Sequence, residues 1–225
     1  SYFKWDTVKP HALTEYGGII DGYDGVEYST ERSSQELPSL NHLLFSALAR
    51  EDRVLTSVPF ITGKATWFYQ ANNFQPYSAA IWRPDPEKIY GTKVNGFLLT
   101  EKAKFFQLWS EVKGNRIDIQ EQDPDLASQA FVYGPKVYLA LNNLEDADKS
   151  VALNFANGLG DLTAVRIKRL NVPYGEAAIY TDEVVDTAPS EIVLAAHETA
   201  ILEYHFSQPI MQNSIVYNRL LLTKH

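Results

Sequence analysis

The first stretch whose residue types could do chemistry is a short apolar run that ends in a carboxylate. Residues 11–18 read His-Ala-Leu-Thr-Glu-Tyr-Gly-Gly, which predicts a buried strand with Glu15 near its carboxyl end. Pro10 can begin a strand without losing a ladder hydrogen bond, and Gly17 permits a sharp turn after it. In barrels of alternating strands and helices, catalytic groups gather at that end of the strands. An ionised glutamate there can attack an anomeric carbon, so we hypothesise that Glu15 is the nucleophile of a retaining glycosidase. The alternative is a loop glutamate after an ordinary strand.

The elements that would position Glu15 alternate between strand and helix. Leucine and alanine recur at spacings of three and four over 37–48, which predicts an amphipathic helix with the serines before it as caps. Residues 54–69 then predict a strand and its following loop, so the three segments form a βαβ unit. A second helix is predicted from Thr100, as its cap, to Gly114, as its stop. We therefore expect 1–114 to be the last strands and helices of a (β/α)8 barrel.

From residue 115 the hydrophobic period changes from 3.6 to 2, which indicates strands. We expect an antiparallel β-sandwich over 115–207, and a linker or the start of a further segment over 208–225. The predicted strands cover 116–120, 129–133, 136–142, 150–155, 163–170, 177–181, 191–194 and 199–206.

Composition excludes several classes of protein. Hydrophobic residues make up 45% of the 225 residues, and no run approaches the roughly 20 apolar residues of a membrane span, so no membrane partner is expected. The net charge of −8 argues against nucleic acid, because phosphate binding needs a basic face. Cysteine is absent, which removes thiolate nucleophiles and zinc-thiolate sites. The five histidines lack close metal-ligand spacing, so no metal site is expected.

Four stretches in this order resemble the carboxyl-terminal part of a clan A glycoside hydrolase, most closely of family 86, the β-agarases and β-porphyranases. They are 12–17 at the seventh barrel strand, 59–67 at the eighth, 105–114 in the last helix and 137–143 at the opening of the sandwich. The resemblance implies a secreted, cell-surface or periplasmic enzyme that hydrolyses β-1,4-galactosidic linkages in agarose or porphyran and needs no cofactor. Agarose is nearly uncharged, so the acidic chain favours it over sulfated porphyran.

The resemblance also implies roles for individual residues. Glu15 matches the nucleophile, and a second glutamate on strand four, outside this sequence, acts as acid and base. Retaining chemistry needs both carboxylates about 5 Å apart, so we expect this chain alone to be an inactive fragment that requires the rest of its barrel. Trp67 matches the aromatic that lies under the sugar at the cleavage point, with a core residue as the alternative. Further candidate substrate contacts are Tyr16, Asn72, Tyr77, Trp82 and Arg83.

Two rival functions stay open. The chain could be a non-catalytic carbohydrate-binding or structural β-domain, with 1–114 only as scaffold. It could also belong to a clan A enzyme that acts on another β-glycan, because the Glu15 motif is shared across the clan. For the sandwich we expect a scaffolding role, since its sequence presents no clear row of exposed aromatic residues.

Overall fold

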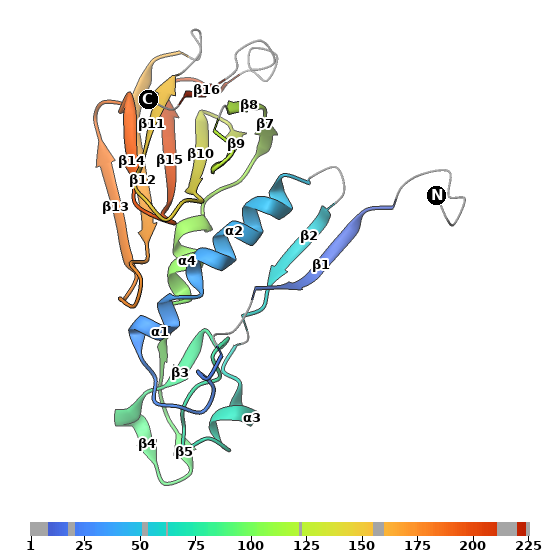
Figure 1. Cartoon of the computed structure of the whole chain (residues 1–225), viewed down its shortest axis with the longest axis vertical. Helices are drawn as coiled ribbons and strands as arrows, with labels where there is room; N and C mark the ends of the chain where they lie inside the picture. The colour runs from blue at the N-terminus through green and yellow to red at the C-terminus, as the bar shows by residue number, and fades with distance from the viewer. Residues whose placement is uncertain are drawn as a thin grey trace.

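The computed structural model describes residues 9–17, 21–50, 54–61, 63–121, 123–154, 160–210 and 220–223. A parallel strand pair with its helices and a small loop-rich lobe make up the first half of the chain, and a β-sandwich makes up the second (Figure 1). Within the described ranges no helix has the length and apolar character that a membrane span requires.

The first half is built on two parallel strands, β1 (His11–Tyr16) and β2 (Val54–Pro59). Two helices connect them, α1 (Thr30–Ser34) and α2 (Leu37–Leu48). Parallel neighbours require such a crossover, so the predicted βαβ unit is confirmed. Two strands are too few to define a (β/α)8 barrel, and the barrel stays a prediction.

Helix α2 begins as predicted but ends at Leu48, shortly before the expected end near residues 50–52, and it lacks the predicted cap. The serines before it lie in the separate helix α1, which is capped by Ser29, whose hydroxyl accepts the Arg32 N–H at 3.3 Å. The residue at the N-cap of α2 is Glu36, and its side chain makes no capping hydrogen bond. The serine cap was therefore wrong, because a short additional helix ends directly before α2.

A small lobe follows β2 and was not predicted as structure. Its strands pair antiparallel as β3 with β6 and β4 with β5. Thr100, the predicted cap of the next helix, donates its hydroxyl to the carbonyl of Ala80 at 2.8 Å and so ties that helix to this lobe; Thr100 does not cap it. The elements are α3 (Thr66–Tyr69), β3 (Trp82–Pro84), β4 (Ile89–Tyr90), β5 (Lys93–Val94), β6 (Phe97–Leu99) and α4 (Ala103–Trp109).

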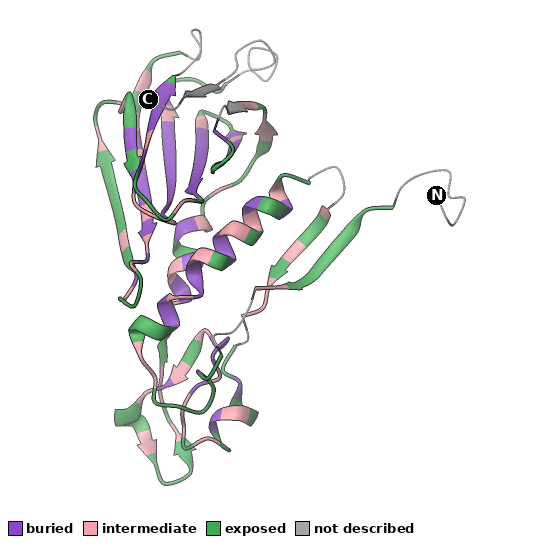
Figure 2. Ribbon diagram, viewed as in Figure 1, coloured by how far each residue is buried: buried purple, intermediate pink, exposed green. Residues whose placement is uncertain are grey.

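The sandwich consists of a six-stranded antiparallel sheet, in the order β13-β12-β15-β10-β9-β7, and a four-stranded sheet, in the order β14-β11-β16-β8. Apolar residues from both sheets fill the space between them, including Leu139, Leu153 and Leu202. The central strands are the most buried part of the molecule (Figure 2). The strands are β7 (Asn115–Ile117), β8 (Ile119–Glu121), β9 (Leu126–Tyr133), β10 (Lys136–Asn143), β11 (Lys149–Asn154), β12 (Leu162–Asn171), β13 (Ile179–Val185), β14 (Glu191–Leu194), β15 (Thr199–Phe206) and β16 (Leu220–Thr223).

The predicted sandwich is confirmed, and its strands pair antiparallel except β16 with β8, which pair parallel; two further details differ. The predicted strand 116–120 is two strands, β7 and β8, and they belong to different sheets. Leu220–Thr223, expected to begin a further segment, instead forms β16 between β11 and β8. The apolar leucine run pairs with the smaller sheet, while the predicted linker at 211–219 lies outside the described residues.

Helices α2 and α4 pack on the outer face of the larger sheet. Their buried residues Leu37, Leu40 and Leu108 join Leu170 and Ile201 of that sheet in a second apolar cluster. This cluster connects the strand pair to the sandwich through the helices.

A buried ion pair lies at the start of both helices. The Lys102 ammonium contacts the Glu36 carboxylate, and their side chains are 1% and 4% exposed. Burial lowers the pKa of Lys102 to about 7. An ion pair in this position costs desolvation, so each partner depends on the other.

Candidate active site

The carboxyl ends of β1 and β2 are level with one another. Tyr16 is paired with Pro59 in the strand register, and the Phe60 N–H donates to the Tyr16 carbonyl at 2.6 Å. The loops that follow the two strands therefore leave from the same edge. Glu15 lies at this edge and is exposed.

The two loops are hydrogen-bonded to each other. The Ser78 N–H donates to Asp24 Oδ1 at 2.9 Å, and the Tyr28 N–H donates to Gln75 Oε1 at 2.9 Å. Asp24 was not predicted as a site residue; its only signal is the Gly-Tyr-Asp-Gly turn at 22–25. The contacts place residues from both strand ends in one wall beside Glu15.

An aromatic cluster in this wall is centred on Tyr77. Its ring centroid lies 5.4 Å from that of Trp67, 5.2 Å from Phe68 and 6.1 Å from Phe60. Trp67 is 64% exposed in the described chain. An indole fixed by ring contacts yet open to solvent presents a flat apolar surface, as sugar sites require.

Glu15 and the aromatic cluster share an electrostatic environment. The pKa of the Tyr77 phenol is raised by burial and by the nearby carboxylates of Asp24 and Glu15. The structure therefore brings three predicted site residues together: Glu15, Tyr77 and Trp67. An ionised carboxylate beside an exposed indole can attack a sugar carbon that the indole supports from below.

The loop after β2 contains backbone strain. Ala65, Asn73 and Phe74 have φ angles of 44°, 51° and 61°. Residues other than glycine adopt this region at a cost of roughly 1–3 kcal/mol, and such residues cluster at functional sites. Ala65 stands directly before α3, the helix that contains Trp67.

Tyr16 lies apart from this group. The register of β1 against β2 is irregular between Leu13 and Tyr16, so the place of Tyr16 is given by its contacts and not by strand alternation. The Tyr16 ring packs on the apolar cluster of α2 and α4, and burial raises the pKa of its phenol to about 12. The described contacts include no hydrogen bond from Tyr16 to Glu15, so the packing interpretation fits this residue.

The remaining predicted contacts have other partners. Asn72 donates to the Phe68 carbonyl at 2.8 Å and so braces the end of α3. Arg83 lies over the Tyr28 ring, with 4.4 Å between the guanidinium carbon and the ring centroid. Trp82 is 37% exposed on β3. Within the described ranges, none of these three side chains forms a hydrogen bond or ion pair with Glu15.

A cluster of three or more His, Cys, Asp or Glu side chains that could hold a metal ion does not occur among the described residues.

Known proteins resemble this chain in sequence and fold. A family model described as porphyranase beta-sandwich domain 1 matches residues 125–221. Beta-porphyranase A of Phocaeicola plebeius is 37% identical over 221 residues, which cover 97% of this chain and 30% of that protein. The structure of a β-porphyranase of glycoside hydrolase family 86 from Bacteroides plebeius has a TM-score of 0.82 and 36% identity, covering 93% of this chain and 37% of that one. BuGH86, solved in complex with neoagarooctaose, has a TM-score of 0.79 and 26% identity, covering 90% of this chain and 32% of that one.

The proteins that this chain resembles are glycoside hydrolases. Within that class, the chain is a relative of the β-porphyranases and β-agarases of family 86, and it spans about 30% of the length of its porphyranase relative.

Proposed function

We propose that this chain forms part of a retaining glycoside hydrolase that cleaves β-1,4-galactosidic linkages within agarose-type red algal galactans. The observation that carries the proposal is the position of Glu15 at the carboxyl end of β1, level with the end of β2, whose following loop holds Tyr77 in ring contact with the exposed Trp67. In the proposed barrel this end of the strands is the catalytic face.

In the proposed reaction, Glu15 attacks the anomeric carbon while the leaving oxygen takes a proton from a second carboxylic acid. The resulting glycosyl-enzyme ester is then hydrolysed by a water that the same second carboxylate activates. That carboxylate would lie about 5 Å from Glu15 and would come from the rest of the barrel. Trp67 would pack on the apolar face of the sugar at the cleavage point.

The substrate class rests on two supports. A family 86 relative has been solved with neoagarooctaose, and another is a β-porphyranase. The net charge of −8 favours the nearly neutral agarose over sulfated porphyran. Because the polymer is too large to enter a cell, we also propose that the parent protein is exported, which fractionation of the producing cells would test.

The test incubates the intact parent protein with agarose and with porphyran and follows the release of reducing ends. We expect cleavage of agarose that falls by at least about 1000-fold in Glu15→Gln, because the neutral amide cannot form the ester. Glu27→Gln is the matched control, since Glu27 is exposed on the adjoining loop. We expect the 225-residue chain alone to release no reducing ends from either polymer. Full activity in Glu15→Gln would refute the proposal, as would cleavage of neither polymer.

A further inference from the structure

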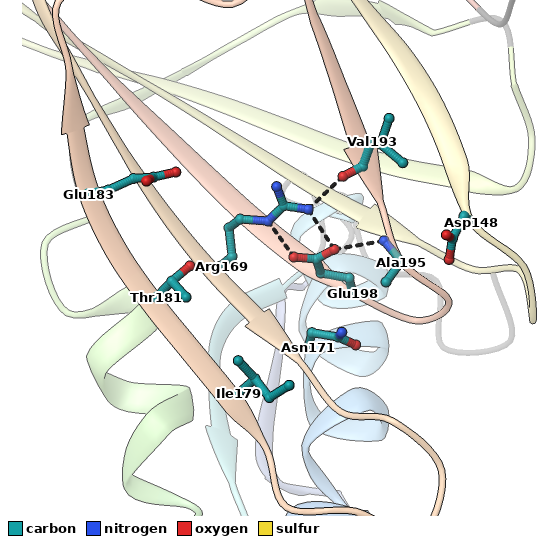
Figure 3. A pocket seen from close by; sticks show the side chains of 9 residues that line it. All are labelled: Asp148, Arg169, Asn171, Ile179, Thr181, Glu183, Val193, Ala195 and Glu198. Carbon is teal, nitrogen blue, oxygen red and sulfur yellow. Dashed lines mark hydrogen bonds and ion pairs between the residues drawn. The ribbon is translucent and has the colours of Figure 1, made fainter.

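A groove on the sandwich, separate from Glu15, has the features of a binding site. Its first part has a volume of about 480 Å³ and lies between strands β12 and β13 on one side and β14 with the turn after it on the other (Figure 3). Most of the side chains that line it are polar.

The strand register explains why this surface is open. Arg169 is paired with Thr181 and Ile167 with Glu183 across β12 and β13, so these residues share the face that packs the sandwich core. The core on this face includes Ile167, but the covering strand β14 has only four residues. The polar end of the face, with Arg169, Thr181 and Glu183, is left uncovered.

Arg169 is fixed in place within this surface. Its Nε donates to Glu198 Oε1 at 2.6 Å, and its Nη2 donates to Glu198 Oε2 at 2.8 Å and to the Val193 carbonyl at 2.5 Å. Glu198 is held in turn by the Ala195 N–H at 2.7 Å. The third nitrogen, Nη1, makes none of these bonds and points away from Glu198 (Figure 3). A donor is thereby positioned for which the described residues supply no hydrogen-bond partner.

Three neighbours of Arg169 also have unused hydrogen-bonding groups. The amide of Asn171, the hydroxyl of Thr181 and the carboxylate of Glu183 make no side-chain hydrogen bond with any described residue, and all three line the pocket. An amide, a hydroxyl and a carboxylate placed along two paired strands can donate to and accept from successive sugar hydroxyls.

The groove continues towards helix α2. A second part, with a volume of about 1000 Å³, shares the wall residues Asp148, Asn171 and Ala195 with the first. It is lined by His42 and His197, whose ring centroids are 5.5 Å apart. His42 Nε2 and His197 Nδ1 are buried there without a hydrogen-bond partner among the described residues. Unpaired buried nitrogens cost free energy, and a ligand rich in hydroxyls would pair them.

An exposed aromatic ring stands on the wall of this second part. Tyr174 is 99% exposed and lines the groove. Its turn is clamped by Gln35, which donates to the carbonyls of Pro173 at 3.2 Å and Glu176 at 2.9 Å and accepts the Gly175 N–H at 3.2 Å. A ring with almost no packing role, held on an immobilised turn, is a preorganised platform for a flat apolar ligand face.

We propose that this groove binds a segment of neutral, hydroxyl-rich galactan and serves as a second polysaccharide site, with Tyr174 as its stacking platform. The polymer class rests on the proposed function, whereas binding itself does not require Glu15. Exposed carboxylates of Asp148 and Glu183 line the groove, whereas its arginine is paired with Glu198 and the Asp146 carboxylate is 2.6 Å from His197 Nε2. Because like charges repel, the groove favours neutral over sulfated chains.

The test titrates the 225-residue chain with neoagarooctaose and with a porphyran oligosaccharide of matched length. We expect tighter binding of neoagarooctaose, and a loss of about tenfold in Tyr174→Ala and in Thr181→Ala, as removal of one stacking or hydrogen-bonding group predicts. Both residues are exposed, so folding should not change. Tyr90→Ala is the matched control because Tyr90 is 59% exposed in the small lobe, and Trp67→Ala separates this site from the one at Glu15.

Binding that is lost in Trp67→Ala but kept in Tyr174→Ala would overturn the inference, as would no binding of either oligosaccharide. A second experiment uses the intact parent protein. There, Tyr174→Ala should reduce release from solid agarose more strongly than it reduces cleavage of soluble neoagarooctaose. Binding to the chain but not to the parent would show that the groove is an interface inside the parent, and would also overturn the inference. Binding without any cleavage by the parent would refute the proposed hydrolase and leave the groove standing.

Discussion

The carboxylate of Glu15 helps to raise the pKa of the Tyr77 phenol, so the end of β1 and the loop after β2 meet in one electrostatic environment. Tyr77 is also the centre of the ring cluster that holds Trp67. This relationship joins the proposed nucleophile to the proposed sugar platform through a single side chain.

The link between Glu15 and Tyr77 can be measured directly. In Glu15→Gln the negative charge is gone, so the pKa of Tyr77 should fall towards its ordinary value of about 10. Asp24→Asn should also lower it, because Asp24 contributes to the same shift. Carbon-13 NMR of labelled tyrosine rings would follow the titration, with Tyr90 as the internal control. An unchanged Tyr77 pKa in both variants would contradict the described geometry.

Trp67→Ala should weaken substrate binding without unfolding the protein. The ring is 64% exposed, so the free energy of unfolding should change by less than about 0.5 kcal/mol. Loss of the stacking surface should raise the KM of the intact parent for agarose by about tenfold. Thermal unfolding and steady-state kinetics would separate the two effects. A lower Tm together with an unchanged KM would make Trp67 a structural residue.

A substitution at Leu55 tests whether β2 is buried inside a barrel in the intact parent protein. It is 74% exposed on β2 in the described structure, so Leu55→Ala should cost the 225-residue chain less than about 0.5 kcal/mol. In the intact parent, the proposed barrel would bury this side chain, and the same substitution should cost about 2–5 kcal/mol. Denaturant unfolding of both proteins measures the difference. Equal small costs in both would argue against a strand buried within a barrel.

The buried pair of Lys102 and Glu36 should show strong coupling. Lys102→Met leaves the Glu36 carboxylate buried alone and should destabilise the chain by about 3–5 kcal/mol. Adding Glu36→Leu removes the stranded charge and should recover most of that loss. A double-mutant cycle on unfolding free energies would show it. Additive costs would mean that the two groups act independently.

Lowering the pH should remove the stabilisation that the ion pair of Arg166 and Asp182 gives to the sandwich. Arg166 donates to both oxygens of Asp182 at 2.7 Å and lowers the pKa of that carboxyl. The folded state therefore binds fewer protons than the unfolded chain, and the stabilisation is present above about pH 4 and is lost as the pH falls through the lowered pKa. Arg166→Gln should cost at most about 1 kcal/mol near neutral pH, because the pair is partly exposed, and less in acid. The free energy of unfolding of Arg166→Gln, measured at several pH values with Lys93→Gln as control, would test this. A destabilisation by Arg166→Gln that is as large in acid as at neutral pH would contradict it.

The elements that could be predicted are those whose signal is local. The helix at 37–48 follows from its three- and four-residue apolar spacing, and the strands of the sandwich follow from alternation. The two- and three-residue strands of the small lobe are too short to show a period. The pairing of β16 with β8 joins segments far apart in the chain, and no local pattern specifies such a contact.

The site residues that could be predicted are those whose side-chain type and position in the expected elements both indicate a site. Glu15 stands at a strand end, Trp67 lies in the short helix α3 after β2, and Tyr77 lies on a long loop. Asp24, in a turn, and Phe68, in α3, are ordinary residue types and were missed, because only the fold brings them to Tyr77 or its loop. The packing of Tyr16 on the helices likewise depends on the fold, because the strand register is irregular between Leu13 and Tyr16.

The measurement that most directly tests the central claim is a search for the covalent intermediate. The intact parent would be incubated with a 2-fluoro galactoside carrying a good leaving group, which slows breakdown of the glycosyl-enzyme, and then digested for mass spectrometry. The account predicts a glycosyl adduct on the peptide that contains Glu15, absent in Glu15→Gln and still present in Glu27→Gln. An adduct on a different carboxylate, or hydrolysis with inverted anomeric configuration and no adduct, would contradict it.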